Sequence, residues 1–240
     1  MKSSTFILQV SLFVFCVILL PSCKSDDDNN TPSNSFTDAR DGNVYQTVTI
    51  GDQVWMAENL RFLPDVVGLV AVSSTIPYYY VYGYNGTDVS AAKATANYNT
   101  YGVLYNWPAA MGGSISSASN PSGVSGVCPA GWHLPSDAEW IELVNFLGDV
   151  NLAGGKLKSQ TLWVNPNTGA SNESGFSGFP GGFKSLGGPF LNLGQNGYWW
   201  SSTEGGENFS WYRSLEYDSP AAPRLTINKG SGFCMRCVKD

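Results

Sequence analysis

Two neighbouring aromatic segments dominate the pattern of hydrophobic and polar positions along the chain. Residues 197–204 are apolar at their centre and bounded by Gly and polar side chains, and residues 208–215 are again rich in aromatic side chains. Large aromatic side chains suit a pleated, half-buried surface, so the pair predicts two central strands of a sheet. Adjacent strand residues point to opposite faces, which predicts that at least one of Trp199 and Trp200 is buried. The other is either an ordinary surface residue or part of a ligand-facing surface.

A hairpin is predicted near the start of the folded part. Residues 44–50 form its first strand, with Val48 and Ile50 on one face, and residues 53–57 form its second. Gly51-Asp52 is a two-residue connection, because Gly adopts a positive φ at the first turn position. The remaining predicted strands cover residues 198–201, 209–217, 224–228 and 233–238, with a turn at 228–232 before the last of them.

A helix is predicted just after the middle of the chain. Ser136 is followed three residues later by Glu139, which forms a capping box in which each side chain accepts a backbone N–H of the first turn. Apolar side chains then recur at helical spacing until Gly148 ends the helix. They are Trp140, Ile141, Val144 and Leu147.

Three stretches show no clear period. Residues 112–126 consist almost entirely of Ser, Gly, Asn, Ala and Pro, which predicts a flexible insertion or long loop. Residues 151–196 are Gly-rich with embedded Phe and predict further long connections. The tyrosine run at 78–84 is either an exposed contact surface or a buried strand, and the sequence leaves both readings open.

Composition and charge narrow the function classes. Only 13% of the 240 residues are charged, and the net charge is -6. An acidic chain disfavours a polyanionic partner, so nucleic acid is not an expected ligand. His133 is the single His, which excludes multi-His metal sites, and we interpret it as a structural, hydrogen-bonded residue. No Gly-rich motif follows a strand and opens a helix in the phosphate-binding manner, so no cofactor is predicted.

The first 22 residues predict a signal peptide that is no part of the fold. Lys2 supplies the positive start, and residues 6–20 form an apolar region too short for a comfortable transmembrane helix of about 20 residues. Residues 20–23, Leu-Pro-Ser-Cys, resemble a bacterial lipobox, although Pro21 departs from its most typical pattern. Cys23 is therefore the predicted lipidation site and the membrane anchor. The alternative is a free Cys beside an ordinary cleavage site.

A polar tether follows the predicted anchor. Residues 24–35 contain no apolar side chain except Pro32, so the segment 23–35 cannot bury enough surface to fold. Its acidic run at 26–28 resembles the surface-export signal of lipoproteins in the Bacteroidetes. This resemblance implies an outer-membrane lipoprotein exposed at the cell surface. A solvated linker that happens to be acidic is the alternative.

Several segments resemble, in the right order, the motifs of the Fibrobacter succinogenes major paralogous domain family. They are residues 41–45, 50–61, 101–107, 128–136, 154–158, 200–204 and 236–240. The resemblance covers roughly residues 38–240, within a domain expected at 36–240. It implies an α+β, C-type lectin-like fold with twisted antiparallel sheets, one or two helices and long Gly-rich loops. The family brings no established activity, and the sequence lacks the Glu-Pro-Asn and Trp-Asn-Asp triplets typical of calcium-dependent lectins.

Three Cys lie in the folded part: Cys128, Cys234 and Cys237. An envelope location is oxidising enough for a disulfide. The resemblance pairs Cys128 with Cys237, because both fall in family motifs, while Cys234 competes as an alternative partner. Cys234 and Cys237 also form a CxxC, but it lies on a predicted strand and not at a helix N-terminus, where a thiolate would be stabilised.

These observations favour a non-enzymatic binding module for a polysaccharide or a protein. Sugar rings stack on aromatic faces, and the best available platform consists of Trp199, Trp200, Trp211 and Tyr212. The first alternative is an enzyme related to the formylglycine-generating oxidases, which share the lectin-like fold and use a Cys pair near the C-terminus. The second is a structural envelope protein without a specific ligand.

Overall fold

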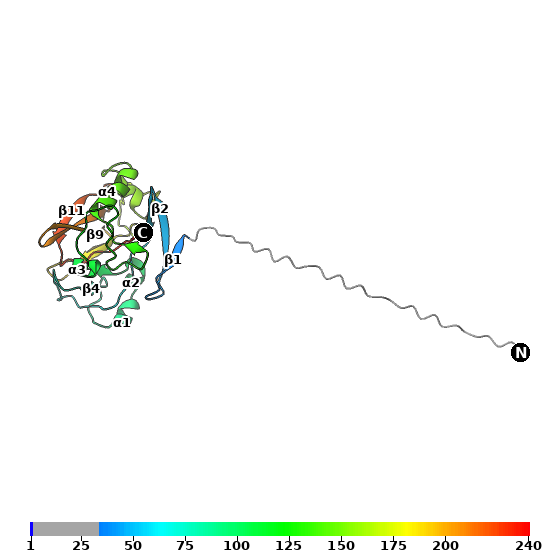
Figure 1. Ribbon diagram of the computed structural model, residues 1–240, viewed down its shortest axis with the longest axis horizontal. Coiled ribbons are helices and arrows are strands. Elements are labelled where there is room, and N and C mark those ends of the chain that lie inside the picture. Colours follow the sequence, from blue (N-terminus) through cyan, green and yellow to red (C-terminus); the bar gives the residue numbers. More distant parts are fainter. Residues whose placement is uncertain (2–33) are drawn as a thin grey trace. The chain divides into compact units, whose positions relative to one another are not determined.

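The computed structural model describes Met1 and residues 34–240. The predicted lipobox, with Cys23, and the acidic run at 26–28 lie outside the described residues. The described domain is an α+β structure in which antiparallel sheets predominate and helices are few and mostly short (Figure 1). Among its residues, no helix combines the length and the apolar character needed to cross a membrane.

One sheet joins the two ends of the domain. Its strands lie in the order β1 (Ser35–Thr37), β2 (Val44–Ile50), β3 (Gln53–Met56), β12 (Val238–Lys239) and β6 (Trp132–His133). The predicted hairpin is confirmed, because β2 and β3 pair with Ile50 opposite Gln53 across the Gly51-Asp52 turn. Val238 lies opposite Trp55, so the last strand closes the domain against the first hairpin, and Figure 1 shows the C-terminal end beside β2.

The two aromatic segments form the second sheet, as predicted. Its order is β11 (Arg224–Asn228), β10 (Phe209–Glu216) and β9 (Asn196–Gly206). Two small two-stranded sheets complete the set: β4 (Tyr79–Tyr80) with β5 (Leu104–Tyr105), and β7 (Gly181–Lys184) with β8 (Phe190–Leu193).

The predicted strand at residues 233–238 is mostly irregular, and only its end belongs to β12. The segment runs between the two sheets, and its backbone bonds several elements in turn. Phe233 bridges Tyr105, Cys234 bridges Trp199 in β9, and the Met235 carbonyl accepts the Leu60 N–H at 2.9 Å. A chain that changes partner at each residue cannot form a regular ladder, and this explains the difference.

The structure contains five helices in the described part, where one or two were expected. They are α1 (Val89–Lys93), α2 (Ala96–Tyr101), α3 (Trp107–Met111), α4 (Asp137–Phe146) and α5 (Ala153–Leu157). The predicted helix is α4, and its Ser136–Glu139 capping box is present. The first three short helices are too short to show a hydrophobic period, and each begins at a side-chain cap, supplied by Asp88, Thr95 and Asn106 respectively.

Strand β9 separates two hydrophobic cores. Trp200 is fully buried in the first core, and Trp199, which is 1% exposed, lies in the second core. The alternation of the two side chains is as predicted, but both faces of the strand are covered. Trp199 packs near Trp140 of α4, and Trp200 packs on Phe233 at a ring distance of 4.6 Å.

A buried polar network connects the second core to the hairpin. The Asn59 side-chain oxygen accepts hydrogen bonds from Trp199 Nε1 at 2.9 Å and from Arg236 Nε at 3.1 Å, and its amide donates to the Tyr101 carbonyl at 2.9 Å. The other guanidinium nitrogens of Arg236 donate to the carbonyls of Met56, Phe176 and Ser177. Five segments far apart in the sequence therefore meet at one amide and one guanidinium group.

A disulfide joins Cys128 to Cys237, with the two Cα atoms 5.9 Å apart. This is the pairing that the family resemblance implied, and it ties the segment that precedes β6 and α4 to the residue just before β12. Cys234 is free and buried. In the chain-entropy model, closing a loop of this length contributes about 4–5 kcal/mol as an upper estimate.

Residues 112–126 form the long loop that their composition predicts, with no helix or strand. Hydrogen bonds fasten it at two places. The Ser117 carbonyl accepts from the Thr203 hydroxyl at 2.7 Å, and the Val124 carbonyl accepts from the Leu134 N–H at 2.8 Å. The loop thereby covers the end of β9.

The Asn59 network generates the first prediction. Asn59→Ala leaves the Trp199 and Arg236 donors buried without their acceptor, and each such loss costs about 1–3 kcal/mol. We expect the free energy of unfolding to fall by about 2–5 kcal/mol, measured by urea unfolding with the disulfide intact. Asn99→Ala is the control, because exposed Asn99 bonds only the Thr95 carbonyl of its own helix. Equal effects of the two substitutions would contradict the role given to the network.

Candidate functional site

The four residues of the predicted aromatic platform do not share a surface. Trp199 and Trp200 are buried, so the hypothesis that either faces a ligand is wrong. Tyr212 is half-buried and points to the first core, where its ring lies 4.8 Å from that of Phe233. Trp211 lies on the opposite face of β10, and the Arg224 guanidinium covers its ring at 3.9 Å.

The tyrosine run at 78–84 is neither wholly exposed nor one buried strand. Tyr80 is fully buried, with its hydroxyl bonded to the Ala71 carbonyl at 2.7 Å, while Tyr78, Tyr79 and Tyr82 are partly buried. Only Tyr79–Tyr80 form a strand, β4, because the chain turns at Gly83 with a positive φ. Of these side chains, Tyr79 borders a hollow.

That hollow, which we call the aromatic groove, has a volume of about 720 Å³. It lies between the start of α3, the tip of the β9–β10 hairpin and the loop that precedes β4. Its apolar lining is Pro77, Tyr79, Trp107, Pro108 and Met111, and its polar lining is Ser74, Thr75, Ser114, Glu207, Asn208 and Lys229. Volume and mixed lining are those of a small-ligand site.

Local sequence signals build one wall of the groove. Asn106 caps α3 by accepting the Ala109 N–H at 3.1 Å, and Pro108 occupies the first turn, where a missing N–H costs nothing. Trp107 Nε1 donates to the Ser201 carbonyl at 3.0 Å, which fixes the ring. Lys229 lies above that ring at 4.5 Å and bonds Glu204 at 2.6 Å. The wall is therefore rigid and preformed.

Some polar groups that line the groove have no hydrogen-bond partner among the described residues. Within the described residues, the Tyr79 hydroxyl, the Asn208 amide and the Glu207 carboxylate form no hydrogen bond with another side chain or with the backbone. Burial, together with the Asp65 carboxylate, raises the pKa of Tyr79, so its hydroxyl stays protonated and can donate. These groups are available to a ligand.

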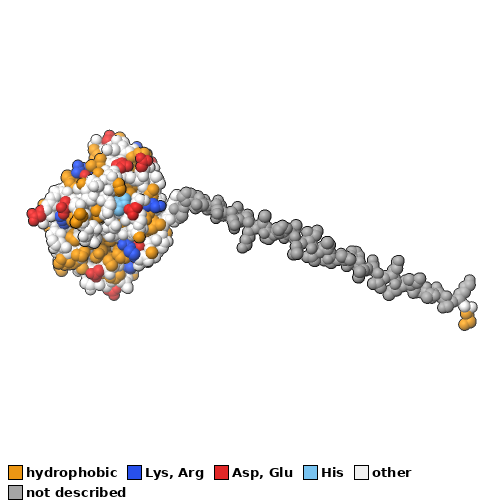
Figure 2. All heavy atoms as spheres, viewed as in Figure 1, with side chains coloured by type: hydrophobic (Ala, Val, Ile, Leu, Met, Phe, Trp, Pro, Cys, Tyr) orange, Lys and Arg blue, Asp and Glu red, His pale blue; other side chains and the backbone are white. Residues whose placement is uncertain are grey.

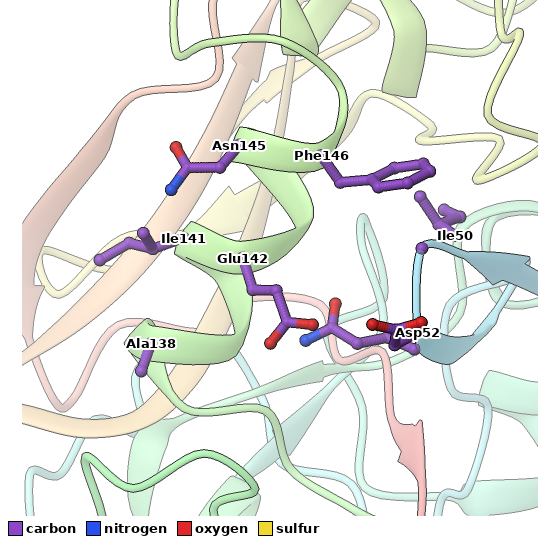
Figure 3. Close-up of a pocket in the computed structure, with 9 residues that line it drawn as sticks. Ile50, Asp52, Ala138, Ile141, Glu142, Asn145 and Phe146 are labelled. Carbon is purple, nitrogen blue, oxygen red and sulfur yellow. The ribbon is translucent and has the colours of Figure 1, made fainter.

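A second hollow, the hairpin–helix cleft, lies between the Gly51-Asp52 turn and α4. Its volume is about 600 Å³, and Figure 3 shows how its side chains lie. In Figure 3 the Glu142 side chain extends from α4 toward the turn that carries Asp52, and the Phe146 ring lies beside Ile50. A smaller hollow of about 510 Å³ adjoins it and includes His133, Glu139 and Asp240.

His133 is held between two carboxylates, as a structural residue would be. Its Nδ1 lies 2.7 Å from Asp240 Oδ1, and its Nε2 lies 2.6 Å from Glu139 Oε1. The other Glu139 oxygen accepts the backbone N–H groups of Ser136 and Ser122. Burial lowers the pKa of His133, but the hydrogen bonds to Glu139 and Asp240 outweigh it and leave the pKa above its ordinary value. Both ring nitrogens are occupied, and no group of side chains among residues 34–240 is arranged to hold a metal ion.

The two Cys of the CxxC motif are in different chemical states. Cys237 is in the disulfide, and Cys234 is fully buried, which raises the pKa of its thiol to about 12. A buried thiol with a raised pKa is a poor nucleophile. The two sulfurs therefore do not form a reactive pair in this structure.

Charge is distributed without a basic patch on the visible face. Figure 2 shows Lys and Arg side chains there in separate small groups among neutral and acidic atoms.

Sequence reasoning missed Tyr79, Trp107 and Lys229 as members of one site. The only local signal was the run Asn106-Trp107-Pro108, an N-cap followed by a helix-start Pro, which could have located α3. The groove itself is formed by segments that are far apart in the sequence and meet only in the fold.

The His133 contacts generate the second prediction. Because the pKa of His133 is raised in the folded state, its contribution to stability is fully present below about pH 6.5 and is lost as pH rises through the folded-state value. Asp240→Asn removes one carboxylate and should reduce this pH dependence, measured by urea unfolding from about pH 6 to about pH 9. Glu207→Gln, at an exposed site, is the control. Lys158, whose pKa burial lowers to about 8, also titrates in this range, so the contribution of His133 is the difference between the natural protein and His133→Gln. Identical pH profiles of these two proteins would contradict the prediction.

Comparison with known proteins agrees with the family resemblance of the sequence motifs. No curated protein and no solved structure matches the chain. The family model of the Fibrobacter succinogenes major domain matches residues 48–239, which include the hairpin turn, the disulfide, α4 and all of the sheet β11-β10-β9. The chain therefore belongs to the Fibrobacter succinogenes major domain family.

Proposed function

We propose that this protein is a lipid-anchored, non-enzymatic binding module at the bacterial surface, and that it holds a polysaccharide in the aromatic groove. The observation that carries the proposal is a preformed hollow of about 720 Å³ that combines aromatic and proline surfaces with unengaged polar groups. A sugar presents an apolar ring face and several hydroxyl groups, and this lining complements both.

The charges around the groove favour a neutral polysaccharide over an acidic one. Lys229 is its one cation, and its ammonium group already bonds the Glu204 carboxylate and the Glu207 carbonyl. The Glu207 carboxylate remains unpaired at the edge of the groove. An acidic polymer would meet this charge and the net charge of the whole chain.

The finer fold reading is part of the proposal. A last strand paired with the first hairpin, two antiparallel sheets, a disulfide and long loops around the groove support a C-type lectin-like architecture. In such an arrangement the sheets hold the loops, and the loops carry the recognition groups.

The oxidase-like alternative needs an accessible Cys pair. The bonded Cys237 and the buried Cys234 weigh against that reading. A purely structural envelope protein has no use for a groove with unengaged polar groups, which is the reason we prefer a ligand-binding role.

The third prediction tests the groove. Glu207→Ala combined with Asn208→Ala removes two exposed polar groups at the hairpin tip, where the fold does not depend on their side chains. We expect polysaccharide binding to weaken about tenfold or more, since each hydrogen bond to a ligand is worth about 0.5–1.5 kcal/mol and bonds to charged groups more. An array of neutral and acidic polysaccharides identifies the ligand, and titration calorimetry measures the affinity.

Two controls accompany this test. Asn151→Ala with Asp218→Ala makes the same pair of changes at exposed positions away from the groove, and Trp211→Ala removes the aromatic residue on the outer face of β10. Both should bind like the natural protein. Absence of binding to every polysaccharide, or a loss confined to Trp211→Ala, contradicts the proposed groove.

The fourth prediction concerns the anchor. Cys23→Ala should prevent lipidation and release the protein from the membrane fraction, which fatty-acid labelling and cell fractionation measure. Replacing Asp26, Asp27 and Asp28 by Ala should leave it lipidated but protected from proteinase added to intact cells. A Cys23→Ala protein that still incorporates fatty acid would refute the lipobox, and equal digestion with and without the three Asp would refute the export signal.

A further inference from the structure

We infer that the hairpin–helix cleft is a docking site for a basic segment of a partner protein, in which a Lys or Arg side chain stands next to an apolar one. This inference is independent of the aromatic groove, because the two hollows share no lining residue. It depends on an apolar wall and on unpaired negative charge in the same cleft.

The apolar wall is held open by the turn. Phe146 is 63% exposed, and its ring rests on the bare backbone of Gly51, where an added Cβ would lie 3.0 Å from the ring. Gly51 has a φ of +62°, so this contact and the tight turn require the same residue. Phe146 cannot sink into the core behind this turn, and it presents a fixed apolar surface beside Ile50 (Figure 3).

The negative charge has no cation to balance it. The cleft is lined by Asp52 and Glu142 and by no Lys or Arg. Asp52 forms no hydrogen bond or ion pair with any described side chain, and Glu142 bonds only the neutral Asn120 amide. The Glu142 side chain extends from α4 toward the turn that carries Asp52 (Figure 3), so the two carboxylates line the same cleft.

Further acidic and apolar residues lie near the hairpin–helix cleft. The adjoining hollow adds Asp240 and Glu139, which share His133, while Lys239 is its single cation from Lys or Arg. Beyond the end of α4, Val150 and Leu152 are 41% and 55% exposed. The partner thus meets an acidic centre with apolar residues to one side.

A protein segment fits this combination better than a free ion. Lys and Arg carry an apolar stem and a charged head, so one side chain can lie along Phe146 and place its charge between the carboxylates. No group of side chains among the described residues is arranged to hold a metal ion, and the cleft has a volume of about 600 Å³. Attraction between the acidic chain and a basic segment also accelerates their encounter.

The test uses the full-length protein on an array of immobilised 12-residue peptides in which Lys, Arg, Asp, Glu, Leu and Phe are equally frequent. We expect bound peptides to be enriched in a basic residue next to an apolar one. For the tightest of these peptides, Asp52→Asn with Glu142→Gln should weaken binding about five- to tenfold, and Phe146→Ser should weaken it by a similar factor. Binding by the natural protein should also fall as salt is raised.

Asp218→Asn with Glu207→Gln is the matched control, because it removes two exposed carboxylates elsewhere, one of them in the aromatic groove. It should bind peptides normally. No enrichment, enrichment in acidic peptides, or a loss in the control alone overturns the inference. So does a dimer, detected by sedimentation, that Asp52→Asn with Glu142→Gln dissociates, because the occupant would then be a second copy of this chain.

Discussion

The buried guanidinium of Arg236 is the interaction on which the rest of the domain depends. Its side chain is 1% exposed, and among the described residues no carboxylate forms an ion pair with it. Burying a charge is costly unless hydrogen bonds replace its water, and here three backbone carbonyls and Asn59 do so, with the Phe176 ring at 4.0 Å on one face. Desolvation still lowers the pKa of Arg236, and each further loss of a partner would leave a buried N–H group unsatisfied.

The same device recurs because the domain has little regular structure. Long Gly-rich loops leave carbonyls that no helix or strand satisfies, and buried carbonyls need donors. Arg offers five N–H groups and Lys three, so one cation can satisfy several loop carbonyls at once. Lys158 does this for the carbonyls of Thr168, Glu216 and Ser219 at 2.8–2.9 Å, and burial lowers its pKa to about 8. Part of the small charged fraction of this chain therefore serves the interior.

Local patterns were sufficient for some elements and insufficient for others. The hairpin, α4 and strands β9 to β11 could be predicted because a turn, a capping box and aromatic strand residues act over a few positions. The burial of both Trp199 and Trp200 could not, because it depends on cores that lie on both sides of β9. The short helices could not be predicted either, because a helix of about one turn is too short to show a hydrophobic period. The pairing of Cys128 with Cys237 was predicted from the family motifs, and the structure confirms it.

The candidate site was the least predictable part, and the physical reason lies in the division between core and loops. Aromatic side chains that stand out in the sequence, such as Trp199 and Trp200, are the ones the core uses. The groups left for a ligand, such as Tyr79 and Asn208, come from a two-residue strand and a hairpin tip and show no motif. Both hollows lie where loops meet the edge of a rigid element, with α3 fixing one and α4 the other. A domain built in this way can change its ligand by exchanging loop residues, while the Arg236 network and the two sheets beneath them stay the same.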